Sequence, residues 1–198
     1  MDYKGKGSLP AKVILASGSP RRRELLGEMG IEFEIDVPDV DETMDGSPEN
    51  MVKALAERKA CAVAEKRSEG LIVAADTLVA LKGRALGKPV DEAEAKQMLH
   101  ALSGQTHDIF TGVCVKNAAT GKTMVCADRT GVCFREVTDE EIEAYVATGE
   151  PMDKAGAYAI QGGAAAFVEK YEGSRTNAIG LPVELLETML RDMNESAD

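Results

Sequence analysis

The stretch VILASGSPRRRELLGEM, residues 13–29, decides how this chain begins to fold. Its first four residues are apolar and predict a short buried strand. Ser19 suits the N-cap of a helix, Pro20 suits the first helical position, and Gly30 is placed to end the helix over Arg21–Met29. A buried strand that leads directly into a helix is typical of an α/β protein.

The same stretch places three arginines, Arg21, Arg22 and Arg23, in the first turn of the predicted helix. A helix N-terminus carries a partial positive charge, so a cation there costs from a few tenths to about 1 kcal/mol. The arrangement is favourable when an anion lies between the arginines and the free N–H groups. A surface helix whose arginines reach solvent or acidic neighbours is the alternative, so the pattern suggests a phosphate site without deciding it.

Strand and helix patterns alternate along the rest of the chain, which predicts an α/β fold with a mixed, twisted sheet flanked by helices. Helices are predicted to begin after Ser47, Asp91 and Thr138 and near Pro182. The predicted strands cover residues 31–37, 71–75, 109–115 and 123–134, followed by a hairpin that pairs Ala157–Ile160 with Ala166–Tyr171.

Composition excludes several classes of protein. The 198 residues carry a net charge of −11, which disfavours nucleic acid as a partner, and no apolar run is long enough to cross a membrane. Residues 1–10 lack the apolar core of a signal peptide, so we expect a flexible N-terminus ahead of one domain, residues 11–198. The four scattered cysteines favour reduced thiols and a cytoplasmic location.

Two acidic positions could hold a metal. Asp76 follows the apolar run Leu71–Ala75, where a carboxylate is costly unless it is exposed, paired or bound to metal. Glu42 lies in an acidic loop, and a solvated charge run is its simplest interpretation. Magnesium takes one or two protein carboxylates and completes its shell with water and phosphates, so Asp76 and Glu42 would suffice.

Three lysines could contribute charge to a polyphosphate site. Lys88 in LGKP and Lys154 in DKAG lie in predicted turns, and Lys59 lies within the predicted helix that contains LAERKA. Each could equally be a solvated surface residue. His107 and Asp108 are adjacent in a predicted strand and point to opposite faces, which excludes a Ser-His-Asp triad.

Taken together, the motifs resemble the Maf (septum formation protein) nucleotide pyrophosphatases, which are relatives of the inosine triphosphate pyrophosphatase fold with its central cleft. The resemblance covers roughly residues 12 to 192, and its segments occur in the family's order. They are LASGSPRRRELL, LAERKA, AADTLVAL, LGKP, LSGQTHDIFTGV, EPMDKAGAYAIQGGAAAFVEKYEGS and IGLPVELL.

The resemblance implies hydrolysis of a nucleoside triphosphate between its α- and β-phosphates, with Mg²⁺ or Mn²⁺ as cofactor. It implies that Asp76 is the proton acceptor and also a metal ligand, with Glu42 and Asp153 as weaker metal candidates. The phosphate-binding positions that it implies are Ser17, Ser19, Arg22, Lys59, Lys88 and Lys154.

Three positions match the subgroup of this family that acts on dTTP and UTP, namely Arg21, Thr77 and Gln161. The resemblance therefore implies pyrimidine specificity, with modified pyrimidine triphosphates as further candidates, and a role in cleaning the nucleotide pool. The alternative is a nucleotide-binding regulatory protein linked to cell division arrest without significant turnover.

The segment EGSRTNAIGLP departs from the family, because Arg175 and Thr176 stand where relatives commonly carry bulkier or aromatic residues. We expect this segment to affect substrate preference or subunit contacts. The resemblance and the apolar C-terminal helix favour a homodimer.

Overall fold

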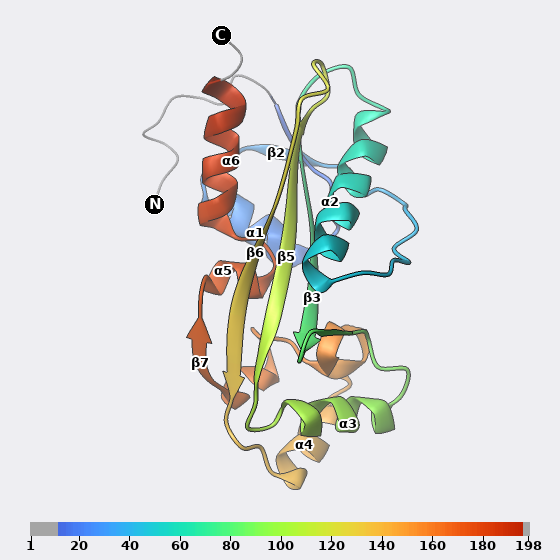
Figure 1. Cartoon of the computed structure of the whole chain (residues 1–198), viewed down its shortest axis with the longest axis vertical. Helices are drawn as coiled ribbons and strands as arrows, with labels where there is room; N and C mark the ends of the chain where they lie inside the picture. The colour runs from blue at the N-terminus through green and yellow to red at the C-terminus, as the bar shows by residue number, and fades with distance from the viewer. Residues whose placement is uncertain (1–11, 196–198) are drawn as a thin grey trace.

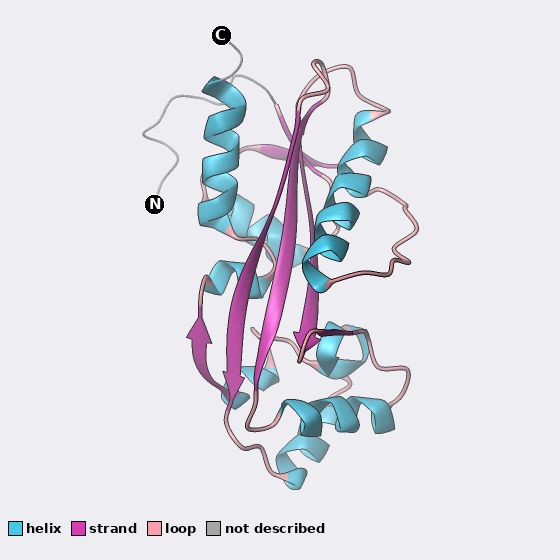
Figure 2. Ribbon diagram, viewed as in Figure 1, coloured by secondary structure: helices cyan, strands magenta, loops and turns pink. Residues whose placement is uncertain are grey.

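The computed structural model describes residues 12–195, and a mixed sheet forms its centre (Figures 1 and 2). The strand order is β2-β1-β3-β5-β6-β7, with β4 beside β3; β1 runs parallel to β2 and β3, and the other pairs are antiparallel. The strands are β1 (Val13–Leu15), β2 (Phe33–Ile35), β3 (Leu71–Leu81), β4 (Arg84–Leu86), β5 (Thr106–Asn117), β6 (Thr123–Phe134) and β7 (Val168–Glu172).

Helices flank both faces of this sheet, which confirms the predicted fold class. In Figure 1, α6 and α2 lie on opposite sides of the long strands. The helices are α1 (Pro20–Glu28), α2 (Pro48–Ala64), α3 (Glu92–Leu102), α4 (Asp139–Val146), α5 (Arg175–Ile179) and α6 (Val183–Glu195), with 3-10 turns at η2 (Glu150–Asp153), η3 (Ala155–Ala157) and η4 (Gly163–Phe167).

Alternation along the strands assigns each face of the sheet to a different core. Val73 and Ala75 pack with α1 and α6, whereas Ile72 and Ala74 pack with α2. Further along the first of these faces, Val79 and Ile109, near the start of β5, belong to a separate core that includes α3, α4 and the 3-10 turns. One face of the sheet therefore carries two cores, with polar residues between them.

The edge of β3 has a gap between two strand partners. Its pairing with β1 ends at Val73, and its pairing with β4 begins at Val79. Asp76 and Thr77 lie in this gap, and because they are consecutive they point to opposite faces of the sheet. A molecule lying along the gap can therefore reach side chains of both faces.

Close packing at Gly112 brings α2 against this part of the sheet. Gly112 is the β5 partner of Asp76, and a Cβ atom at Gly112 would lie 2.2 Å from the carbonyl oxygen of Val52. Only glycine permits that approach. It lets α2 lie directly over the strand that neighbours Asp76.

The helix starts agree well with the sequence. The Asp91 carboxylate accepts a hydrogen bond from the Glu94 backbone N–H at 2.8 Å, and Thr138 forms the expected capping box with Glu141. Gly30 has a φ of 73°, as the end of α1 requires. The described residues contain no helix that is long and apolar enough to span a membrane.

Three strand predictions need correction. The hairpin of 157–160 with 166–171 is wrong, because Gly156 and Ala157 have positive φ and turn the chain, and β7 pairs with β6 instead. The strand predicted over 31–37 is limited to three residues, and the strand predicted over 71–75 continues to Leu81 because β5 pairs with it throughout. The predicted flexible segment 1–10 lies outside the described residues.

Candidate active site

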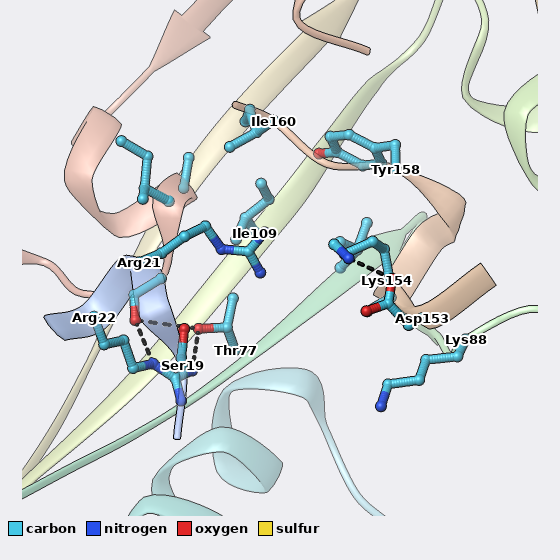
Figure 3. Close-up of a pocket in the computed structure, with 15 residues that line it drawn as sticks. Ser19, Arg21, Arg22, Thr77, Lys88, Ile109, Asp153, Lys154, Tyr158 and Ile160 are labelled. Atoms are coloured by element: carbon cyan, nitrogen blue, oxygen red, sulfur yellow. Dashed lines mark hydrogen bonds and ion pairs between the residues drawn. The ribbon is translucent and has the colours of Figure 1, made fainter. Parts of the chain in front are cut away.

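A cavity of about 230 Å³ lies on one face of the sheet, between its two cores (Figure 3). Thr77, Val79 and Ile109 form its floor, because every second residue of β3 and β5 faces it. The remaining lining residues come from the start of α1, the turn before α3, the 3-10 turns and the end of α5: Ser19, Arg21, Arg22, Lys88, Asp153, Lys154, Ala155, Tyr158, Ile160, Ala178, Ile179 and Gly180.

Arg22 is held by three hydrogen bonds to protein groups. Its Nε donates to the carbonyl oxygen of Gly180 at 2.8 Å, Nη1 donates to Ser17 Oγ at 3.1 Å, and Nη2 donates to Thr77 Oγ1 at 2.9 Å. Burial lowers the pKa of Arg22, and the negative charge of Asp76 partly offsets that effect. A guanidinium has five N–H donors, so Arg22 keeps further donors for a ligand.

The three consecutive arginines have different environments. Arg21 lines the cavity and extends into it in Figure 3, whereas Arg23 is exposed. Within residues 12–195, no hydrogen bond or ion pair joins the Arg21 side chain to another residue. Arg21 is therefore free to contact a ligand, and Arg22 is already fixed in place.

Lys59, Asp76 and Glu42 form a charged cluster at the gap in the β3 edge. Lys59 Nζ lies 2.7 Å from Asp76 Oδ1 and 2.6 Å from Glu42 Oε1. The side chains of Lys59 and Asp76 are 12% and 14% exposed, whereas Glu42 is 62% exposed. The hydrogen bond from Lys59 lowers the pKa of Glu42, so this carboxylate is ionised at neutral pH. The sequence placed Asp76 at a strand end, but it lies inside β3, where β1 no longer covers the edge.

The opposite side of the cavity is built from turns. Lys88 is exposed, and Lys154 forms an ion pair with the exposed carboxylate of Asp153, whose pKa this hydrogen bond lowers. The backbone N–H of Gly156 donates to the carbonyl oxygen of Gly87 at 2.9 Å, which ties the two lysine-bearing turns together. In Figure 3 both lysines lie across the cavity from Arg22.

An apolar part of the cavity adjoins these charges. Ile109, Tyr158 and Ile160 line one part of the cavity, and the Arg21 side chain extends toward Ile109 in Figure 3. The Tyr158 hydroxyl and His107 Nε2 are 2.7 Å apart, and burial lowers the pKa of His107 to about 4. Because His107 is only 1% exposed and neutral, it supports Tyr158 from the core rather than acting on a ligand. Asp108 pairs with Arg129, in agreement with the exclusion of a triad.

Some candidates lie outside the cavity. Gln161 is exposed and does not line it, and the glycines that follow Gln161 make room for Glu150, which accepts a hydrogen bond from the Gly163 N–H at 2.9 Å. Arg175 lies over the ring of Tyr171 at 5.9 Å, and Thr176 Oγ1 donates to Glu184 at 3.1 Å. Arg175 and Thr176, at which the sequence departs from the family, therefore make contacts around α5 and do not line the cavity.

The sequence did not single out Thr111, Tyr158 or Gly180, although each contacts the site. Thr111 is fully buried and lies 3.0 Å from Thr77, oxygen to oxygen. Strand alternation could have indicated it, because Thr111 shares a face with Ile109. Gly180 contributes through its carbonyl oxygen, and a backbone group leaves no signal in residue type.

The donor set is compatible with a divalent metal of the magnesium type. No group of three or more His, Cys, Asp or Glu residues in the described part of the chain could form a complete metal shell. Asp76 and Glu42, however, both lie within 3 Å of the single Lys59 Nζ, so their oxygens converge on one point. Two carboxylates together with phosphate oxygens and water fit the preference of Mg²⁺.

Comparisons with known proteins identify the relatives of this chain. The family model described as Maf-like protein matches residues 12–193. A dTTP/UTP pyrophosphatase of Pelotomaculum thermopropionicum is 50% identical over 182 residues, which are 91% of this chain and 95% of that protein. A dTTP/UTP pyrophosphatase of Bacillus cereus strain AH820 is 50% identical over 185 residues, 92% of this chain and 96% of that protein. This chain belongs to the Maf-like protein family.

Proposed function

We propose that this protein is a nucleoside triphosphate pyrophosphatase that hydrolyses dTTP and UTP to the monophosphate and pyrophosphate. One observation carries the proposal: the ion pair of Asp76 with Lys59 at 2.7 Å lies at the gap in β3, and the next residue, Thr77, lines a cavity together with Arg21, Arg22, Lys88 and Lys154. The names of relatives at about 50% identity support the choice of substrate.

The charges of the site suit a polyphosphate. Cations outnumber carboxylates around the cavity, although the whole chain has a net charge of −11. Phosphoryl transfer depends mainly on positioning and on neutralising charge. We assign the phosphates to the side that carries Ser17, Ser19 and Arg22, with Lys88 and Lys154 completing the enclosure from the turns.

Asp76 is the proposed proton acceptor. Lys59 donates a hydrogen bond to one carboxylate oxygen of Asp76 at 2.7 Å, which fixes the orientation of that group. Asp76 Oδ2 forms no hydrogen bond with a protein group within residues 12–195, and it is the atom that would take a proton from the attacking water. Because Asp76 and Thr77 point to opposite faces at the gap, the substrate must lie across the edge of β3 to reach both.

A divalent metal, Mg²⁺ or Mn²⁺, is the proposed cofactor. Asp76 and Glu42 are the residues that would hold it, and Asp153 is a weaker candidate on the opposite turn. Such an ion, when bound, would neutralise phosphate charge and lower the pKa of water. The residues of the chain would orient the phosphates and receive the proton.

Pyrimidine preference is assigned to the apolar part of the cavity and to Arg21. Arg21 can donate to a base carbonyl oxygen, and Ile109, Tyr158 and Ile160 offer an apolar surface to the ring. Thr77 and Gln161 are the other proposed specificity residues. Since Gln161 is exposed in this structure, its proposed role requires a movement of the turn that carries it.

A nucleotide panel tests the proposal. Pyrophosphate and orthophosphate release are measured with Mg²⁺ and with Mn²⁺ from dTTP, UTP, CTP, ITP, 7-methyl-GTP and 5-methyl-substituted pyrimidine triphosphates. We expect pyrophosphate from dTTP and UTP at the highest kcat/KM. Orthophosphate alone would contradict the proposal, and tight binding without turnover would favour a regulatory protein linked to cell division arrest.

We extend the proposal to a homodimer in which residues 11–198 act as one domain, working in the cytoplasm. The four free cysteines support a reducing compartment, and the nucleotide substrate supports the same location. Size-exclusion chromatography with light scattering tests the dimer, and the expected mass is twice that of the 21.1 kDa chain.

A further inference from the structure

Two threonine hydroxyls form a buried link beneath Arg22. Thr77 Oγ1 accepts a hydrogen bond from Arg22 Nη2 at 2.9 Å and lies 3.0 Å from Thr111 Oγ1. Thr111 Oγ1 lies 3.1 Å from the main-chain carbonyl oxygen of Asn177, and Thr77 Oγ1 lies 3.5 Å from that of Gly180. Thr111 is 0% exposed, so its hydroxyl is shielded from solvent.

Hydrogen counting decides the direction of these bonds. Each threonine hydroxyl has one hydrogen to donate and two lone pairs to accept with. If Thr111 donates to Asn177 at 3.1 Å, Thr77 must donate to Thr111 at 3.0 Å, because two oxygens at that distance repel each other without a hydrogen between them. The reverse order would leave Thr77 only the 3.5 Å contact with Gly180, whose oxygen already accepts from Arg22 at 2.8 Å.

We propose that Thr111 is a positioning residue, which takes the hydrogen of Thr77 so that Thr77 presents only oxygen lone pairs to Arg22 and to the cavity. One lone pair of Thr77 accepts from Arg22, and the other remains available. The inference concerns the same site as the proposed function and rests on it for its effect on catalysis.

This direction has a chemical consequence for the substrate. A ligand atom that touches Thr77 Oγ1 must bring its own hydrogen, because Thr77 has none left to donate. A phosphate or carbonyl oxygen would be repelled there, whereas an N–H or O–H group would be accepted. The specificity assigned to Thr77 therefore depends on a second threonine that does not line the cavity.

Matched variants isolate the hydroxyl of Thr111. Thr111→Val keeps the β-branched shape and removes the hydroxyl, while Thr111→Ser keeps the hydroxyl. The Asn177 carbonyl oxygen retains its bond from the Gly180 N–H at 2.9 Å in either variant, so neither change leaves it unpaired. Thermal unfolding of each variant shows that the protein assayed is folded.

A double-mutant cycle with Thr77 gives the kinetic test. We expect Thr111→Val to lower kcat/KM for UTP by roughly three- to tenfold, the value of one hydrogen bond, and Thr111→Ser to stay within about twofold of the unaltered protein. In a Thr77→Val background, Thr111→Val should have almost no further effect on kcat/KM. Equal losses from Thr111→Val in both backgrounds, or equal losses from the Val and Ser variants, would overturn the proposal.

Neutron diffraction from the deuterated protein tests the direction of the bonds without any turnover. We expect the deuterium of Thr77 on the line to Thr111, and the deuterium of Thr111 on the line to Asn177. A Thr77 deuterium directed at Gly180 or into the cavity would refute the inference. If the nucleotide panel shows no pyrophosphate release, the proposed function fails, and this measurement still decides the inference.

Discussion

The two sides of the cavity differ in how their charged groups are held. The first side, here named the bonded side, consists of Arg22 and Thr77 together with Asp76 at the adjacent edge of β3. Each is hydrogen-bonded to other protein groups at 2.7–3.1 Å, through Ser17, Lys59, Thr111 and Gly180. On the other, here named the turn side, Lys88 is exposed, and Lys154 is paired with the exposed Asp153 next to it in the chain.

This difference suggests different contributions to catalysis. Groups that are already oriented lose little entropy when the transition state forms, so the bonded side should control turnover. Lysines on turns, one exposed and one paired with an exposed carboxylate, attract an anion but must be ordered by it, so the turn side should control affinity. Substitutions on each side should therefore separate an effect on kcat from an effect on KM.

Replacing Asp76 should have the largest effect. Asp76→Asn removes the proposed proton acceptor and should lower kcat for UTP by roughly 10²–10⁴-fold, as expected for loss of a general base. Lys59 keeps its ion pair with Glu42 at 2.6 Å, so the protein should remain folded by circular dichroism. Asp153→Asn on the turn side is the matched control and should lower kcat by less than about threefold. An equal fall in kcat for Asp76→Asn and Asp153→Asn would show that the bonded side and the turn side do not differ in their effect on turnover.

Replacing Arg22 should come next. Arg22→Lys cannot satisfy Ser17, Thr77 and Gly180 together, because an ammonium lacks the planar fork of a guanidinium. We expect kcat/KM to fall about 10²-fold, the cost of one well-placed donor, with a lower melting temperature. The neighbouring Arg23 is exposed, so Arg23→Lys provides a control at the same helix start. Equal values of kcat/KM for the two variants would show that the hydrogen bonds that orient Arg22 do not contribute to catalysis.

Acidification should destabilise the protein through His107, the buried partner of Tyr158 in the cavity wall. Burial lowers the pKa of His107 to about 4 from the ordinary 6.5, although nearby Asp108 acts in the opposite direction. The unfolded chain therefore binds a proton more readily than the folded chain as pH falls from 6.5 to 4. Stability is fully present above pH 6.5 and should fall by up to about 3 kcal/mol across that window.

Urea unfolding at a series of pH values measures this effect. The control variant is His107→Gln, which keeps a polar group near the Tyr158 hydroxyl and cannot be protonated. Its free energy of unfolding should change less between pH 6.5 and 4 than that of the unaltered protein. Parallel curves for the two proteins would show that His107 does not account for the loss.

The sequence predicted the parts of the site that depend on local pattern. The start of α1, with Pro20 in the first turn and Arg21 to Arg23 after it, was readable because capping and helix dipole rules act within a few residues. The gap in β3 was not readable, because it depends on where β1 stops pairing, which is a property of two segments about 60 residues apart. Asp76 was therefore expected at a strand end and lies inside one.

The false hairpin has a similar cause. Residues 157–160 are apolar enough for a strand, but the positive φ values at Gly156 and Ala157 turn them into the wall of the cavity. Local propensity could not show that β7 would instead pair with β6. Contacts made through backbone carbonyls, such as that of Gly180 with Arg22, were likewise invisible, since they depend on position and not on residue type.

Replacing the lysines of the turn side should have the smallest effect. Lys88→Met and Lys154→Met should each raise KM for UTP by about two- to fivefold and leave kcat nearly unchanged, because an ion pair that a phosphate forms with a solvent-accessible lysine contributes only about 0.2–1 kcal/mol. Raising the salt concentration should reduce these differences, since screening weakens exposed charges first. The exposed Lys66 at the end of α2 supplies the control variant Lys66→Met. A large loss of kcat in either turn variant would mean that the turns close on the substrate and become as fixed as the bonded side.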